Sequence, residues 1–114
     1  MFRQRSKYWN KKVLINWIKF DSKKEAKFYQ DLKILERAGH IENLELQPKF
    51  ILQENFKFNW KTERAITYIA DFKYYDIFKK EWFVIDVKWF KTEVYKIKRK
   101  LLLYKFKDFT FLEK

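Results

Sequence analysis

The stretch IADFKYYDIFKKEWFVIDVKW, residues 69–89, decides how the rest of the chain is interpreted. Two runs of apolar and aromatic residues flank a short polar segment, which is the pattern of a β-hairpin. The second run, residues 81–89, contains Asp86 and Lys88 among apolar residues, which predicts a strand at the centre of a sheet. Because side chains alternate along a strand, Asp86 and Lys88 share a face, and the hairpin brings Asp71 near Asp86.

Six further segments have recognisable patterns, which predict two helices and several strands around this hairpin. They are a β-hairpin at 13–20, a helix at 21–39, a strand at 43–52, a hairpin over 55–75, a helix at 91–105 and a strand at 109–112. For the first helix the N-cap is Asp21 or Ser22, and Gly39 occupies the C′ position. The expected fold is therefore α+β (or α/β), with an αβββαβ core, a mixed central sheet and an N-terminal β-hairpin.

Periodicity also predicts which side chains face the core. In the first helix these are Ala26, Tyr29, Leu32 and Leu35, with Phe28 beside them. In the second helix they are Val94, Ile97, Leu101 and Tyr104. In the strand at 43–52 they are Leu44, Leu46, Phe50 and Leu52, and Pro48 places this strand at an edge or a bulge.

Composition limits the class of protein. A chain of 114 residues, 47% of them hydrophobic, is expected to form a single domain over residues 1–114 with one modest core. There is no cysteine and only one histidine, which excludes disulfides, thiolate metal sites and a multi-histidine centre. No apolar run approaches the roughly 20 residues of a membrane helix, and the basic N-terminus lacks the apolar stretch of a signal peptide. We expect no membrane partner and a cytoplasmic location.

The charge of the chain is strongly positive. Lysine and arginine number 27 against 15 aspartates and glutamates, a net charge of +12. One interpretation is a polyanionic partner, most simply nucleic acid. The other is the codon bias of an AT-rich genome, which enriches Lys, Phe, Ile, Tyr and Asn together and leaves open a structural phage protein that is basic by bias alone. Charge by itself does not choose between them.

The acidic residues suggest a metal site. Asp71 and Asp86 would repel each other at close range unless a cation lies between them, and Mg²⁺ is held by one or two carboxylates with water and phosphate oxygens. A third acid, Glu25, lies on the inner side of the first helix, although Ser22-x-x-Glu25 also fits a capping box. The alternative for Asp71 is a strand-end residue, and for Asp86 with Lys88 an ion pair at a sheet edge.

Glu25 on a first helix, then Asp71, then Asp86-x-Lys88 resembles the PD-(D/E)XK nuclease superfamily, whose core is an αβββαβ unit. More narrowly, residues 20–52, 68–76 and 83–104 resemble a small phage-encoded endonuclease family that includes candidate Holliday-junction resolvases. The resemblance implies a single restriction-endonuclease-like domain. Ala70 stands where the superfamily name has proline, a departure that is common among divergent members.

The resemblance also implies roles for individual residues. Asp71, Asp86 and Glu25, with the carbonyl of Val87, would bind Mg²⁺, for which Mn²⁺ can substitute, and Lys88 would be the catalytic lysine. The implied activity is hydrolysis of phosphodiester bonds in branched or recombination DNA, by a possible homodimer. The residues expected to contact DNA are Lys23, Lys24, Lys96, Lys98, Arg99 and Lys100, whose alternative is a solvated helix face. The competing function is a non-catalytic nucleic-acid-binding protein on the same fold.

Tryptophan and glycine are distributed unusually. The chain has five tryptophans and one glycine, and Trp17 and Trp60 each follow an asparagine at a predicted hairpin turn. Asn-Gly is the expected pair there, because both turn positions need positive φ. In the resembled family the positions of Trp9, Trp17, Trp60 and Trp89 are typically glycine. Either UGA codons of this gene are read as tryptophan in place of glycine, or AT-rich drift has removed glycines.

Overall fold

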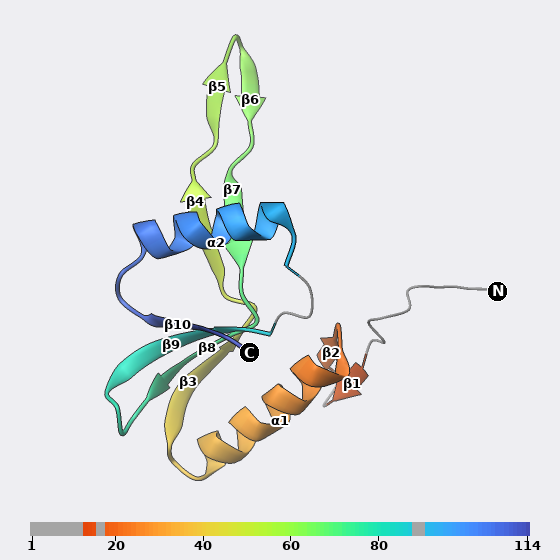
Figure 1. Ribbon diagram of the computed structural model, residues 1–114, viewed down its shortest axis with the longest axis vertical. Helices are drawn as coiled ribbons and strands as arrows, with labels where there is room; N and C mark the ends of the chain where they lie inside the picture. Colours follow the sequence, from red (N-terminus) through yellow and green to blue (C-terminus); the bar gives the residue numbers. More distant parts are fainter. Residues whose placement is uncertain (1–12, 16–17, 88–90) are drawn as a thin grey trace, which may run out of the picture.

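The computed structural model describes residues 13–15, 18–87 and 91–114 (Figure 1). Lys88 lies outside the described residues, as do Trp9, Trp17 and Trp89. Neither helix in the described ranges is long and apolar enough to cross a membrane.

A four-stranded sheet forms the centre of the molecule, in the order β10–β9–β8–β3. Its strands are β3 (Ile41–Leu46), β8 (Phe72–Asp76), β9 (Glu81–Asp86) and β10 (Thr110–Glu113). β8 is antiparallel to β3 and β9, whereas β10 runs parallel to β9, so the sheet is mixed as predicted. β9 has a neighbour on each side, which confirms the central position inferred from its apolar sequence.

The two faces of this sheet carry different layers. One face packs against α1 (Lys23–Arg37) and the hairpin of β1 (Val13–Ile15) and β2 (Ile18–Phe20). The other packs against α2 (Glu93–Lys105), which lies across the ribbon of β4 (Lys49–Gln53) and β7 (Ile66–Ile69). Alternation along β9 divides its side chains accordingly: Phe83 and Ile85 enter the α1 core, and Val84 enters the α2 core.

The start of α1 has a variant of the capping box, in which the reciprocal bond comes from Asp21, the residue before the N-cap. Ser22 is the N-cap, and its Oγ accepts a hydrogen bond from the Glu25 amide at 3.1 Å. In return, Glu25 Oε1 accepts one from the Asp21 amide at 3.0 Å. Gly39 follows the helix with φ +80°, the left-handed conformation that favours glycine at C′. Of the predicted stripe, Ala26, Tyr29 and Leu32 are buried, whereas the prediction for Leu35 is wrong because its side chain is exposed.

The prediction of one strand over residues 43–52 is wrong. The chain breaks at Gln47 and Pro48, where Gln47 has φ +52°, so that β3 pairs with β8 and β4 pairs with β7. The opposing chain breaks at the same level: the Gln47 amide donates to the Asp71 carbonyl at 2.9 Å, and the Ala70 amide donates to the Pro48 carbonyl at 3.1 Å. The expected common face is therefore divided. Leu44 and Leu46 pack on the α1 core, whereas Phe50 and Leu52 pack on the α2 core.

Beyond β4 and β7 the ribbon continues as a hairpin of β5 (Phe56–Phe58) and β6 (Lys61–Glu63), which projects away from the rest of the molecule (Figure 1). The predicted turn is confirmed, with Asn59 and Trp60 at its centre. Their φ values are +49° and +65°, the conformation for which Asn-Gly is preferred. Trp60 thus occupies a glycine-like backbone position with its side chain in solvent.

The predicted inner face of α2 is wrong. Val94, Ile97, Leu101 and Tyr104 are 40 to 79% exposed. The inner face instead carries Tyr95 and Leu102 and continues into Phe106 after the helix end. The helix has apolar residues on two sides, and the side with Leu102 packs on Phe50 and Tyr68 of the narrow ribbon. Sequence periodicity identifies both stripes but not which of them meets a neighbour.

Candidate functional site

Asp71 and Asp86 lie beside each other at one end of the β8–β9 hairpin. The register pairs Phe72 with Ile85, so the two aspartates take the next positions along their chains. The Asp71 amide donates to the Ile85 carbonyl at 3.1 Å, and Asp71 Oδ2 accepts from the Val87 amide at 2.7 Å. The spatial proximity inferred from the hairpin pattern is therefore present.

Glu25 reaches the same place from α1. Its side chain is buried and is hydrogen-bonded to Asp71, while its Oε1 also serves the capping box. The two interpretations of Glu25 are thus compatible, because one carboxyl group makes both contacts. Burial, the Glu25 hydrogen bond and the negative charges of Glu25 and Asp86 raise the pKa of Asp71 to about 9, against the opposing effect of the Val87 amide. The raised pKa favours the protonated form of the Asp71 carboxyl group when no cation is bound.

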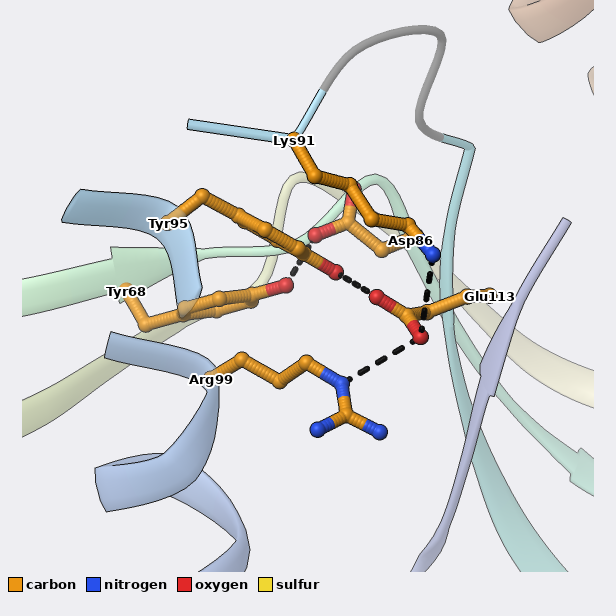
Figure 2. A network of polar contacts seen from close by, with 6 residues as sticks. All are labelled: Tyr68, Asp86, Lys91, Tyr95, Arg99 and Glu113. Atoms are coloured by element: carbon orange, nitrogen blue, oxygen red, sulfur yellow. Dashed lines mark hydrogen bonds and ion pairs between the residues drawn. The ribbon is translucent and has the colours of Figure 1, made fainter. Parts of the chain in front are cut away.

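Asp86 is fully buried, and its partner is a tyrosine that the sequence patterns did not identify. The Tyr68 hydroxyl, from β7, donates a hydrogen bond to Asp86 Oδ2 (Figure 2). Burial and then the hydrogen bond to Asp86 raise the pKa of Tyr68 well above its ordinary value, so this hydroxyl remains a neutral donor. Tyr68 precedes Asp71 by three residues. Its contact with Asp86, eighteen residues away in the sequence, follows from the folded structure and not from a local sequence pattern.

A fourth carboxyl group, Glu113, lies next to this pair. The parallel register of β10 and β9 makes Glu113 the partner of Asp86. Glu113 accepts a hydrogen bond from the Tyr95 hydroxyl, and its Oε1 lies 3.2 Å from Arg99 Nε and 3.7 Å from Lys91 Nζ (Figure 2). Burial opposes ionisation of Glu113, but Tyr95 and the two cations outweigh it and hold its pKa below the ordinary value. Glu113 is therefore an ionised carboxylate whose charge is balanced by Arg99 and Lys91.

The described acids do not form a ready-made site for a divalent metal ion. Within residues 13–15, 18–87 and 91–114, no three Asp, Glu or His side chains are grouped closely enough to hold one. The donor chemistry nevertheless fits Mg²⁺, which prefers hard carboxylate oxygens. The carboxyl groups of Glu25, which is buried, and Asp71, which is partly buried, can lie this close only with a shared proton or a cation. Oδ2 of Asp86 accepts the hydrogen bond of the Tyr68 hydroxyl.

The six basic residues expected to contact DNA fall into two groups. Lys23, Lys24, Lys96 and Lys100 are exposed on the helices, and Lys96 pairs with Glu93 at 3.2 Å. Lys98 and Arg99 are partly buried. Arg99 pairs with Glu113 through its Nε, so its position is that of a structural ion pair. Lys88, the predicted catalytic lysine, lies outside the described residues.

Comparison with known proteins gives one match. The model of the family described as "Protein of unknown function (DUF1064)" matches residues 5–113. No curated protein and no solved structure is significantly similar to the chain. Since the match spans nearly the whole chain, the protein belongs to the DUF1064 family.

Proposed function

We propose that this protein is a metal-dependent DNA endonuclease acting on branched or recombination DNA. The observation that carries the proposal is the convergence of Glu25, Asp71 and Asp86. They come from α1, from the bend between β7 and β8, and from the end of β9. Three acids brought together by distant segments, in a chain of net charge +12, suit a cation that bridges protein and phosphate.

The roles follow from the resemblance to the PD-(D/E)XK superfamily, and contacts support the orientation of Asp71 and Asp86. Asp71, Asp86 and Glu25, with the carbonyl of Val87, would hold Mg²⁺ or Mn²⁺. The metal would supply an activated water and neutralise charge on the phosphate. The Val87 amide orients the Asp71 carboxyl group, and the Tyr68 hydroxyl orients that of Asp86. Lys88, two residues after Asp86, would stabilise negative charge on the phosphate in the transition state.

A second candidate function is nucleic-acid binding without catalysis. It is favoured by the side-chain arrangement, in which no three acids of the described segments form a metal-holding group and Asp86 is engaged by Tyr68. This candidate predicts tight, salt-sensitive DNA binding and no cleavage with either metal.

Cleavage of labelled four-way-junction, flap and linear duplex DNA in Mg²⁺ and in Mn²⁺ distinguishes the two functions. The variants are Asp86→Asn and Lys88→Ala. The matched control is Asp31→Asn, which makes the same change at an exposed α1 residue paired with Lys27. We expect the first two to lose cleavage by at least a hundredfold and the control to keep it. Binding without cleavage by the wild type on every substrate would establish the second candidate and reject the first.

The proposed homodimer follows from the substrate, since a symmetric branch presents two strands to be cut. Light scattering after size exclusion tests it with and without junction DNA. A monomer under both conditions would remove the dimer and leave the nuclease proposal intact.

A further inference from the structure

The hairpin arm, defined as residues 55–64, carries large aromatic side chains into solvent. Phe56 is 47% exposed, Phe58 61% and Trp60 96%. Figure 1 shows the arm extending beyond both helices and the central sheet. A two-stranded hairpin is at best marginally stable in water, and large exposed aromatic groups are typical of a binding surface. The arm therefore has the character of a contact element.

The arrangement of the aromatic rings is regular. Phe56 pairs with Glu63 and Phe58 with Lys61, so both phenylalanines lie on the same face of the hairpin, two residues apart. That separation is roughly 7 Å along a strand. It equals about two stacking distances of 3.4 Å, the spacing of successive bases in DNA. The gap between the two rings is therefore wide enough for one base to stack between them.

The charges of the arm indicate the kind of partner. Lys57, Lys61 and Arg64 are exposed, against a single acidic residue of the arm, Glu63. Lys61 and Glu63 share the face of the two phenylalanines, whereas Lys57 is on the opposite face. Exposed aromatic rings interleaved with cations are the features that bind single-stranded nucleic acid, by base stacking together with phosphate neutralisation. A second copy of the chain is a poorer match, because each copy carries +12.

We propose that the arm binds unpaired bases of the DNA substrate. Phe56 and Phe58 stack on a base, and Lys61, which shares their face, contacts a flanking phosphate. The substrate class is accordingly DNA with unpaired nucleotides, such as the branch point of a flap or a junction. This inference rests on the proposed function for the identity of the substrate, but the binding itself requires neither metal nor cleavage. It does not depend on Trp60.

The test measures binding in EDTA, with 2-aminopurine placed at the branch of a flap and at the matching position of a paired duplex. The variant is Phe56→Ala with Phe58→Ala, and Phe58→Tyr is the conservative control that keeps an aromatic ring. A surface control is Phe78→Ala, which removes an aromatic side chain that is 69% exposed in the segment between β8 and β9. Thermal unfolding confirms that each variant is folded.

We expect the wild type to quench 2-aminopurine in the flap, and the double variant to bind the flap about 5- to 150-fold more weakly, the range of one lost base stack. Affinity for paired duplex changes less than twofold, and both controls behave as wild type. If the double variant does not fold, Lys61→Gln replaces it in the test. We then expect the slope of log binding constant against log salt concentration to fall by about one for the flap and to stay unchanged for the duplex.

Three results would overturn the inference. These are equal loss of affinity for flap and duplex, quenching that survives in the double variant, and a wild-type dimer that the double variant converts to a monomer. In the last case the arm is a contact between copies. Absence of cleavage alongside normal quenching would reject the proposed nuclease but keep the arm as a binding element, so the two failures are distinguishable.

Discussion

Replacing Tyr68 by phenylalanine removes one oxygen atom and, with it, the hydroxyl that donates to the buried carboxylate of Asp86. The ring itself is buried between Tyr95 and Phe111, and phenylalanine preserves those aromatic contacts. The change is therefore confined to the contacts of the hydroxyl, chiefly the hydrogen bond to Asp86 and also the interaction with Tyr95. We expect the variant to fold to the same structure with a lower free energy of unfolding.

The magnitude follows from the type of bond. A hydrogen bond to a charged group contributes about 1.5 to 3 kcal/mol to stability. For 114 residues at about 2.1 cal/mol/K per residue, the unfolding entropy is about 0.24 kcal/mol/K. The expected decrease in Tm is consequently about 6 to 13 °C.

Differential scanning calorimetry at pH 7 in EDTA measures this decrease without interference from bound metal. The matched control is Tyr104→Phe, the same chemical change on the exposed side of α2, for which we expect a shift of less than about 0.5 kcal/mol. If Tyr68→Phe lowers Tm by less than 2 °C, the Tyr68–Asp86 bond does not stabilise the fold. The role of Tyr68 in orienting Asp86 would then be rejected as well.

Three further substitutions test other parts of the structure. Asp71→Asn should raise the Tm of the metal-free protein at pH 8. Because the raised pKa makes the folded state bind more protons than the unfolded state between about pH 4 and 9, wild-type stability falls as pH rises through that range. An unchanged pH slope in the variant would contradict this. Leu102→Ala should lower the free energy of unfolding, measured in urea, by about 2 to 5 kcal/mol, and Leu101→Ala should lower it much less. Equal decreases would refute the assigned inner face of α2. Trp60→Gly should relieve about 1 kcal/mol of left-handed backbone strain. Amide exchange measured by NMR should then become slower in the arm and stay the same in β9. Faster exchange in the arm would show that the Trp60 ring stabilises the arm.

Much of the central unit was predictable from local pattern. The β8–β9 hairpin, the capped α1 and the approach of Asp71 to Asp86 depend on residues close in sequence or on strict alternation. Glu25 was predictable as a buried acid because its helical position coincides with the inner face of α1. For these features, sequence separation is short and each pattern has one structural solution.

The remainder depends on contacts that no local pattern encodes. Alternation continues across Gln47 and Pro48, so the pattern gives no sign that the strand divides between two cores. Glu113 reaches Asp86 through parallel pairing of strands far apart in the chain. The Tyr68 contact likewise requires the ribbon to fold back over the end of β9. Long-range pairing, and not residue type, decides all three.

One bend sets the directions of both the acidic site and the hairpin arm. The backbone bonds between Gln47 and Asp71 and between Pro48 and Ala70 fix where the ribbon leaves the central sheet, and Asp71 is part of that bend. The eleven residue-to-residue steps from Gln47 to Phe58 span no more than about 36 Å, which is roughly ten nucleotides at 3.4 Å each. If the arm holds an unpaired base and the acids hold the metal, cleavage must fall within about ten nucleotides of the branch. Mapping the cut sites on end-labelled flap DNA tests this limit. Cuts that all lie farther away would show that arm and acids do not act on the same bound DNA in this geometry.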